Sequence, residues 1–279
     1  MIVDLNGRAV YAYTAGKRFD PARPTAVFLH GAEHDHSVWA LQSRYFAYHG
    51  FNLLAVDLPG HGRSAGPAAA SVGELADWVA ALCDAVGAAS AFVAGHSMGS
   101  LVALDFAGRY PHRVARLALL ATAVPMTVSD ALLDAALNRE AEAIDLVNRW
   151  SHSTIAAKPS CPGPGFWLHG MNQRLMEHVA ARGEAQLFHT DFAACHAYAD
   201  GLVRAGQVRC PVRLIVGAKD MMTPPRAARA LADALVAAGV EVDTVVLDSG
   251  HALMTEQPDG TLDALIEFAR PLLEGKPQP

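Results

Sequence analysis

The sequence contains few cysteines and no pair of them in the spacing of a redox or zinc motif. Its four cysteines, Cys83, Cys161, Cys195 and Cys210, lie far apart in a chain of 279 residues. Domains that depend on disulfides are much denser in cysteine, whereas scattered cysteines in a chain of this length are typical of free thiols in a reducing compartment. We therefore expect free thiols and a cytoplasmic protein, although spacing alone leaves disulfide pairing open.

Long hydrophobic runs and basic clusters are also missing. Asp, Arg and Gly interrupt the alanine-rich stretches before any of them reaches the ~20 residues of a membrane-spanning helix. The first residues, Met1–Leu5, carry no basic segment followed by an apolar one, so they predict no secretory signal. The net charge is -6, and no basic run with interleaved aromatics occurs. We expect neither a membrane nor a nucleic acid as partner, but a small-molecule substrate.

What the sequence does contain is a regular succession of apolar runs and helical patterns. Runs of strand length occur at Ala9–Tyr13, Thr25–His30, Asn52–Asp57, Ala91–Gly95, Arg116–Ala121, Val212–Gly217 and Asp243–Leu247. Helical patterns occupy Val38–His49, Ser71–Val86, Met98–Tyr110, Pro224–Ala238 and Pro258–Leu273. The central runs are continuous rather than alternating, which is typical of parallel strands covered on both faces. The alternation predicts an α/β fold with a mostly parallel, doubly wound sheet.

One stretch interrupts this alternation. Residues 124–207 contain no convincing strand, and helical patterns cover Ser129–Asn148, His169–Arg182 and Glu184–Ala205. A loop rich in proline and glycine, Lys158–Gly165, separates the first two. Long insertions over active sites often form lids, so we expect residues 124–207 to form a helical cap on a core domain made of residues 1–123 and 208–279. The alternative is that the stretch only adds packing around the core.

The most informative segment is Gly95-His96-Ser97-Met98-Gly99, which follows an apolar run and precedes a helical pattern. A serine on a sharp strand-to-helix turn has its oxygen pushed out of the sheet, and the two glycines leave room for that backbone. Asp220 and His251 follow later strands, and ligands of such sheets bind beyond the carboxyl ends of the strands. Ser97, Asp220 and His251, in this order, predict a serine hydrolase.

On these residues the chain resembles the α/β-hydrolase superfamily over nearly its full length. Further matching segments are Phe28-Leu29-His30-Gly31, Asp57-Leu58-Pro59-Gly60-His61-Gly62-Arg63-Ser64, Ile215-Val216-Gly217-Ala218-Lys219-Asp220 and Ser249-Gly250-His251. The motif with methionine after the serine is similar to that of esterases, enol-lactonases and cofactor-free haloperoxidases. The resemblance implies the α/β-hydrolase fold, with the helical cap inserted after the sixth core strand, and it implies no cofactor.

The resemblance also implies a role for each matching residue. Ser97 would be the nucleophile, His251 the base that activates it, and Asp220 the acid that orients the histidine. The backbone N–H groups of Ala32 and Met98 would form the oxyanion hole. Helix capping is the alternative role for Asp220.

Other polar residues near these positions have competing interpretations. Asp248 is a rival for the acid, although it lies only three residues before the histidine. The run His30–His36 contains several possible metal ligands, but its spacing matches no tight zinc pattern, so we expect no metal. Glu33 is expected at the mouth of the pocket, where a carboxylate would disfavour anionic acyl groups. We expect His30 and His61 to be structural.

These features together predict a hydrolase of carboxylic esters of small to medium, mostly uncharged substrates. The predicted cap offers large side chains for an apolar pocket or for packing on the core: Trp150, Phe166, Trp167, Met171, Met176, Phe188 and His189. The same triad would serve a lactonase, thioesterase, amidase or aminopeptidase, C–C bond hydrolase, acyltransferase or haloperoxidase-like perhydrolase. A non-catalytic small-molecule receptor and a homo-oligomer also remain open.

Overall fold

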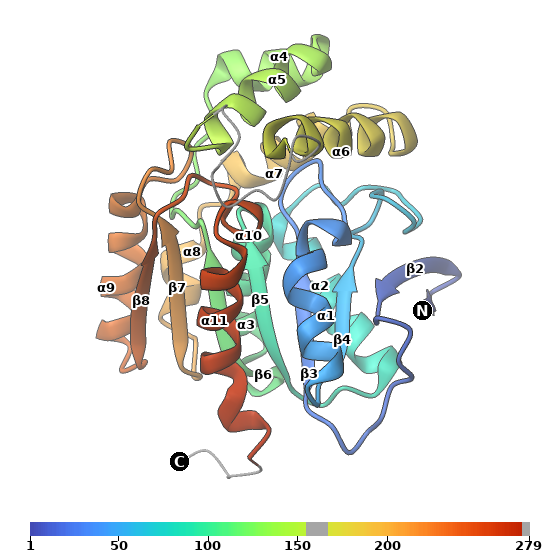
Figure 1. Ribbon diagram of the computed structural model, residues 1–279, viewed down its shortest axis with the longest axis vertical. Helices are drawn as coiled ribbons and strands as arrows, with labels where there is room; N and C mark the ends of the chain where they lie inside the picture. The colour runs from blue at the N-terminus through green and yellow to red at the C-terminus, as the bar shows by residue number, and fades with distance from the viewer. Residues whose placement is uncertain (155–166, 275–279) are drawn as a thin grey trace.

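One sheet of eight strands runs through the part of the chain that the structure describes, residues 1–154 and 167–274 of a computed structural model (Figure 1). The strands are β1 Ile2–Leu5, β2 Arg8–Tyr13, β3 Thr25–Leu29, β4 Asn52–Val56, β5 Ala91–His96, β6 Val114–Leu120, β7 Val212–Gly217 and β8 Val242–Leu247. Their order in the sheet is β1-β2-β4-β3-β5-β6-β7-β8. The β1–β2 and β2–β4 pairs are antiparallel and the others are parallel. This confirms the predicted fold class.

The first strand, β1, was not predicted. It is a mostly exposed strand at the edge of the sheet, so it lacks the continuous apolar pattern of the central strands. Asn6 and Gly7 connect it to β2 with φ angles of 56° and 82°. An Asn-Gly pair between two strands is a strong hairpin signal, so the sequence did contain the information.

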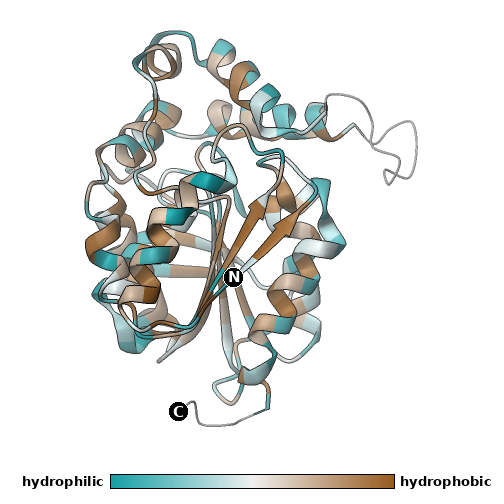
Figure 2. Ribbon diagram, turned by 90° about the vertical axis from the view of Figure 1, so that its left-hand side faces the viewer, coloured by the Kyte–Doolittle hydropathy of each residue, from teal (hydrophilic) through white to brown (hydrophobic). Residues whose placement is uncertain are grey.

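Helices cover both faces of the sheet. On one face lie α1 (Ala40–Tyr48) and α11 (Pro258–Ala269), and on the other α2 (Val72–Val86), α3 (Met98–Arg109), α8 (Gly201–Ala205) and α9 (Arg229–Ala237). Short helices are η1 His36–Trp39, η2 Pro111–Arg113, η3 Pro225–Ala228, α10 Leu253–Glu256 and η4 Arg270–Leu272. Figure 2 shows the largely hydrophobic strands enclosed by helices that carry hydrophilic residues on their outer sides.

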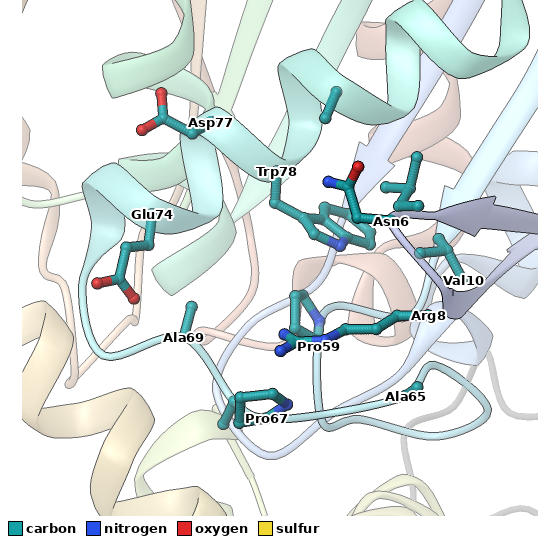
Figure 3. A pocket seen from close by; sticks show the side chains of 13 residues that line it. Asn6, Arg8, Val10, Pro59, Ala65, Pro67, Ala69, Glu74, Asp77 and Trp78 are labelled. Atoms are coloured by element: carbon teal, nitrogen blue, oxygen red, sulfur yellow. The ribbon is translucent and has the colours of Figure 1, made fainter.

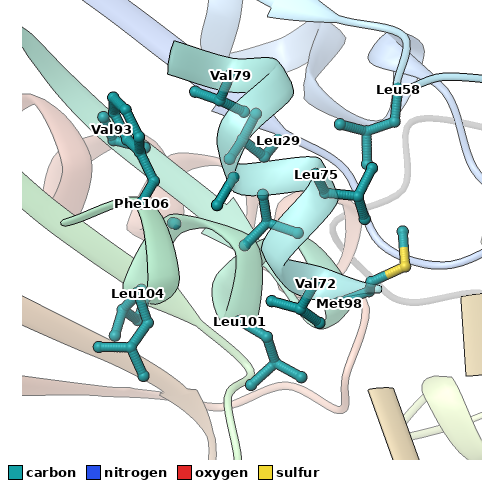
Figure 4. Packing of buried hydrophobic residues seen from close by; sticks show 14 of the residues in the cluster. Leu29, Leu58, Val72, Leu75, Val79, Val93, Met98, Leu101, Leu104 and Phe106 are labelled. Atoms are coloured by element: carbon teal, nitrogen blue, oxygen red, sulfur yellow. The ribbon is translucent and has the colours of Figure 1, made fainter. Parts of the chain in front are cut away.

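The side chains of each central strand alternate between two cores. In β3, Val27 belongs to the core under α2 and α3, whereas the next residue, Phe28, packs edge-on against Phe46 of α1 on the opposite face. Figure 4 shows the first of these cores, where side chains of α2 and α3 gather around Leu29 and Val93. Because both faces are covered, every residue of β3, β4 and β5 is buried, which explains the continuous apolar runs.

Of the described helices between β6 and β7 in the sequence, four lie above the carboxyl edge of the sheet, at the top of Figure 1. They are α4 Asp130–Asn138, α5 Glu140–Ser151, α6 Leu168–Arg182 and α7 Leu187–Ala197, and we call them the cap. The predicted helices Ser129–Asn148 and Glu184–Ala205 are each divided in two. The first divides at Arg139, whose backbone is not helical (φ -147°, ψ 53°) and whose side chain pairs with Asp134 and Glu142.

The predicted cap range also contains a helix that packs on the core. The α8 helix, inside the predicted cap range, packs against α3 and α9 on the core side. The division of the chain into core and cap domains stays a prediction, and the loop Lys158–Gly165 lies outside the described residues. None of the described helices combines the length and the apolar character needed to cross a bilayer.

Candidate active site

Ser97 lies at the turn between β5 and α3, where its backbone adopts φ 53° and ψ -120°. This conformation is strained for a residue with a side chain. A Cβ atom at Gly95 would overlap the carbonyl oxygen of Gly99, and one at Gly99 would overlap the carbonyls of Leu29 and His30. The turn therefore needs both glycines, and it leaves Ser97 half-buried at the carboxyl end of the sheet.

Asp220 and His251 meet beyond the ends of β7 and β8. Oδ2 of Asp220 lies 2.8 Å from Nδ1 of His251, and both side chains are buried. Oδ1 of Asp220 accepts the N–H groups of Met222 and Thr223 at 2.8 Å, and Oδ2 accepts the hydroxyl of Thr223 at 2.8 Å. Burial alone would raise the pKa of Asp220, but His251 and Thr223 hold it well below its ordinary value.

Thr223 was missed at the sequence level. Its hydroxyl lies 2.8 Å from Oδ2 of Asp220 and 3.1 Å from Nδ1 of His251, so it contacts both partners of the pair. Nothing in the local sequence marks this threonine, because its role depends on a strand that arrives later in the chain. The rival acid, Asp248, instead pairs with Lys219 at 2.6 Å on the surface.

The loop that carries His251 is held by the residue before the serine. Nε2 of the buried His96 donates a hydrogen bond to the carbonyl oxygen of His251 at 2.9 Å. Burial holds the pKa of His96 well below its ordinary value, so the ring is neutral. Because a carbonyl only accepts, its proton lies on Nε2. The turn at Ser97 and the loop at His251 are thus joined directly.

Ser97 and His251 line one cavity of about 190 Å³, together with Ala32 and Met98. The other described residues of its wall are Met126, Thr127, Val128, Ser129, Leu132, Trp150, Phe192, Cys195, Met221, Met222 and Thr223. None of the described wall residues is Asp, Glu, Lys or Arg. The structure therefore brings a hydroxyl, an oriented imidazole and a largely apolar pocket together.

The two predicted oxyanion donors lie on the wall of this cavity. Met98 is the first residue of α3, so its N–H has no partner within the helix and lies at the positive end of the helix dipole. Ala32 follows β3 and is buried. Both residues therefore line the same cavity as the serine.

Among the cap side chains expected in the pocket, Trp150 lines the cavity. Met176 and Phe188 are buried in the core. Trp167 and Met171 line a separate hollow on α6, and His189 contacts α4. Phe166 lies outside the described residues. Helical periodicity alone does not say which face of a cap helix turns toward the site, and for Met176 and Phe188 the structure shows the alternative of packing in the core.

Glu33 does not face the pocket mouth as expected, because its side chain is fully buried behind the loop. Its two carboxylate oxygens have no hydrogen-bond partner among the described residues. Burial, and then the neighbouring Asp191 of α7, raise the pKa of Glu33 to about 8. Glu33 is therefore neutral at pH 7, and the expected repulsion of anionic acyl groups has no structural basis.

The histidines expected to be structural are buried and hydrogen-bonded. Nδ1 of His30 lies 2.8 Å from the carbonyl oxygen of Gly31, and Nε2 accepts the N–H of Leu58 at 3.0 Å. Nε2 of His61 lies 2.9 Å from Oδ2 of Asp191. These contacts hold the loops that follow β3 and β4.

A group of potential metal ligands, Asp35, His36 and Asp57, has its ligand atoms within 4.8 Å of one another. Asp57 already accepts the N–H of His36, the ring Nδ1 of His36 and the N–H of Arg63, at 2.8, 2.6 and 2.9 Å. These hydrogen bonds tie the two loops together, and we assign the group to the fold of the loops.

A second hollow, of about 560 Å³, lies away from Ser97, between the β1–β2 hairpin, residues 59–69 and α2 (Figure 3). Two acids border it, and both already bond to other protein groups. Glu74 accepts the N–H of Ala70 at 2.9 Å, and Asp77 pairs with an arginine of α3 at 2.7 Å. None of the described residues that line this hollow was predicted as a site residue.

Comparison with known proteins yields a family match. A family model described as the alpha/beta hydrolase family matches residues 26–264, a range that includes Ser97, Asp220 and His251. A pimeloyl-[acyl-carrier protein] methyl ester esterase of Chromobacterium violaceum is 32% identical over 222 residues, which are 76% of this chain and 82% of that protein.

A further relative is longer than this chain. The dihydrolipoyllysine-residue acetyltransferase component of the acetoin cleaving system of Pseudomonas putida is 28% identical over 252 residues. These are 88% of this chain but only 63% of that protein, so the chain spans less than two thirds of its length. Among solved structures, the enol-lactonase from Burkholderia xenovorans LB400 aligns with a TM-score of 0.82 and 24% identity, over 97% of this chain and 100% of that chain. At 24% identity, the similarity to this enol-lactonase is evidence for the fold alone.

Proposed function

Because this chain belongs to the alpha/beta hydrolase family, we propose that it is a serine hydrolase of carboxylic esters of small to medium, mostly uncharged molecules. The observation that carries the proposal is the buried Asp220–His251 pair, with 2.8 Å between Oδ2 and Nδ1, whose histidine lines the same cavity as Ser97. A serine hydroxyl is a weak nucleophile at neutral pH and needs an adjacent, oriented base.

The proposed reaction has two halves. In the first, Oγ of Ser97 attacks the ester carbonyl while its proton passes to Nε2 of His251, and the N–H groups of Ala32 and Met98 stabilise the oxyanion. His251 then returns the proton to the leaving alcohol, which departs from the acyl-enzyme. In the second, water attacks the acyl carbonyl while His251 takes its proton, and His251 then returns that proton to Oγ of Ser97 as the acid leaves. Asp220 keeps the histidine in the required tautomer throughout.

The substrate class follows from the cavity. A volume of about 190 Å³ suits small acyl or alcohol groups, and a wall without Asp, Glu, Lys or Arg among its described residues provides no partner for a substrate charge. Lactones, thioesters, amides, activated C–C bonds and perhydrolysis would use the same residues. A panel of these substrates separates the possibilities, and we expect the highest kcat/KM for uncharged esters.

The triad itself is tested by substitution and labelling. We expect Ser97→Ala to reduce hydrolysis of p-nitrophenyl esters by at least about 10³-fold, because the nucleophile is lost. A fluorophosphonate probe, followed by peptide mass mapping, should modify Ser97 in the wild type.

Two outcomes would contradict the proposal. One is esterase activity in Ser97→Ala close to that of the wild type. The other is modification of Ser129, the second serine on the described cavity wall, in place of Ser97. A non-catalytic receptor would show neither turnover nor labelling, and its ligand affinity would be insensitive to Ser97→Ala.

We further propose that the cap encloses the substrate and that the protein acts in the cytoplasm. The cap and the segment leading into it contribute Met126, Leu132, Trp150 and Phe192 to the cavity wall, which supports residues 124–207 as a lid. Three cysteines, Cys83, Cys195 and Cys210, are buried free thiols, as a reducing compartment permits. Cys161 lies outside the described residues.

A further inference from the structure

The peptide group that joins Ala32 to Glu33 is held at both of its polar atoms by side chains. The carbonyl oxygen of Ala32 accepts a hydrogen bond from Nδ1 of His34 at 2.6 Å. The N–H of Glu33 donates to Oδ2 of Asp191 at 2.9 Å. Because a carbonyl only accepts, the ring of His34 carries a proton on Nδ1. Asp191 belongs to α7, so a cap residue holds the loop that follows β3.

The backbone of this loop needs such support. Glu33 has a φ of 53°, in the left-handed region, which is strained for a residue with a side chain and persists only where the surroundings determine it. On the other side of Ala32 the loop lies against the nucleophile turn. A Cβ atom at Gly31 would lie 3.2 Å from both Nδ1 of His96 and Cβ of Ser97.

Both contacts of the peptide are anchored deeper in the cap. Nε2 of His34 lies 3.0 Å from the side-chain amide of Asn172 on α6. The side-chain nitrogen of Asn172 donates to Oδ1 of Asn148 on α5 at 3.0 Å, and that of Asn148 donates to the carbonyl oxygen of His169 at 2.8 Å. The loop next to the serine is therefore linked through side chains to α5 and α6.

The second anchor is an ion pair. Oδ2 of Asp191 lies 2.9 Å from Nε2 of His61, and both side chains are almost fully buried. Burial alone would lower the pKa of His61, but the charge and hydrogen bond of Asp191, and then the carbonyl oxygen of Pro59, raise it to about 9, so His61 is charged at neutral pH. The pair fixes the position of the carboxylate that receives the N–H of Glu33.

We propose that His34 and Asp191 are positioning residues for the hydrolysis, because they hold the Ala32–Glu33 peptide and thereby aim the N–H of Ala32 at the oxyanion. This inference rests on the proposed function, in which that N–H is an oxyanion donor. Neither side chain is among the described residues of the cavity wall, so neither contacts substrate there. The cap then belongs to the catalytic arrangement, since α6 and α7 hold the donor in place.

A pair of substitutions at His34 separates this role from packing. In His34→Asn the side-chain nitrogen replaces Nδ1 and can still donate to Ala32. In His34→Gln it replaces Nε2, so the contact with Asn172 survives and the contact with Ala32 is lost. We expect His34→Asn to stay within about threefold of the wild-type kcat and His34→Gln to lose about tenfold or more, with KM nearly unchanged in both. A packing role would give the opposite order, because Gln is closer to His in size.

Asp191→Asn tests the second contact with a transition-state analogue. The amide keeps an oxygen that can accept the N–H of Glu33, but it loses the negative charge that pairs with His61 and fixes the acceptor. A trifluoromethyl ketone binds when its carbonyl carbon bonds to Oγ of Ser97, the hydroxyl proton passes to His251, and the ketone oxygen becomes the oxyanion. We expect kcat and the affinity for this ketone to fall by the same factor, about tenfold, because both depend on the Ala32 donor. Binding of an uncharged amide analogue of the substrate should change less than twofold.

His189→Ala is the matched control for α7. Nδ1 of His189 lies 3.1 Å from the carbonyl oxygen of Leu133 on α4, so this histidine joins two cap helices without reaching the loop at Ala32. We expect wild-type kcat and ketone affinity in this variant. Losses equal to those of Asp191→Asn would overturn the inference, as would unchanged values in both His34→Gln and Asp191→Asn. If Asp191→Asn does not fold, the order of the two His34 variants decides.

If the proposed function itself is wrong, the experiments give a different result. In that case the wild type hydrolyses no substrate of the panel and its Ser97 is not labelled. If the wild type is active and Ser97→Ala is inactive, but His34→Gln and Asp191→Asn match the wild type, only the positioning role is wrong.

Discussion

Two buried carboxyl groups near the site show how surroundings decide charge. Asp220 accepts hydrogen bonds from two backbone N–H groups and a hydroxyl and faces His251, so it is ionised. Glu33 is equally buried, but its oxygens have no partner among the described residues, and its pKa rises to about 8. The same functional group, a carboxyl, is thus a fixed negative charge in Asp220 and a neutral acid in Glu33.

Glu33 makes the stability of the protein depend on pH. Its pKa is raised from an ordinary value near 4.3, so the folded state binds the proton more tightly than the unfolded state. The free energy of unfolding therefore falls as pH rises from about 4.3 to about 8, by at most about 1.4 kcal/mol per pH unit. Glu33→Gln has no proton to release and should escape this loss.

We expect the stability advantage of Glu33→Gln over the wild type to grow by roughly 1–3 kcal/mol between pH 5 and pH 9. Urea unfolding of both proteins at pH 5, 7 and 9 measures it. Comparison at the same pH removes the titrations that both proteins share. An advantage that is the same at all three pH values would show that Glu33 is not a buried neutral acid.

At the scale of elements, the protein uses glycine for two different reasons. Gly87 ends α2 with a φ of 75°, and a Cβ atom there would meet nothing within 4 Å. Gly99 is the second residue of α3 and has helical backbone, but a Cβ there would overlap two backbone carbonyls at the end of β3. Gly87 is needed because its backbone is left-handed, and Gly99 is needed because α3 approaches the sheet too closely for a side chain.

Alanine at these two positions should have different consequences. Gly87→Ala should lower the free energy of unfolding by about 1 kcal/mol and leave esterase activity intact, because only the helix end is strained. Gly99→Ala should lower it by about 3 kcal/mol or more and abolish activity, because backbone must shift beside Ser97. Urea unfolding and p-nitrophenyl ester hydrolysis test both. Similar losses in the two variants would argue against the close approach.

At the scale of the whole molecule, one buried aspartate joins the segment after the cap to the core. Asp105 of α3 is 1% exposed, and its Oδ1 accepts hydrogen bonds from the hydroxyl of Tyr198 and from Nε of Arg204, both at 3.0 Å. Burial, and then the charge of Asp105, raise the pKa of Tyr198 far above its ordinary value, so Tyr198 remains a donor. The chain that leaves α7 is thus fixed on the core before it enters β7.

Asp105→Ala should destabilise the protein by about 3 kcal/mol, because it leaves Arg204 and Tyr198 partly buried without their acceptor. The midpoint of urea unfolding measures the loss. Arg139→Ala is a suitable comparison, since its ion pairs with Asp134 and Glu142 are exposed and should contribute little to the free energy of unfolding. Equal effects of the two substitutions would contradict the anchoring role of Asp105.

The parts of this protein that were predictable depend on short-range rules. Continuous apolar runs indicated the buried strands, Ser71 indicated the start of α2, and the glycines around Ser97 indicated the nucleophile turn. The misses have equally local causes. The exposed strand β1 lacks an apolar pattern, and Arg139 divides a helix without a glycine or proline to mark the break.

The sequence by itself determined the α/β architecture and the segments that end at the carboxyl edge of the sheet, because strand periodicity and glycine geometry are encoded within a few residues. Only the tertiary structure decided which groups meet there. Thr223 joins the Asp220–His251 pair, and the cap residue Asp191 reaches the loop at Glu33 across 158 positions of sequence. Such contacts depend on how distant elements pack, and no local rule specifies that packing.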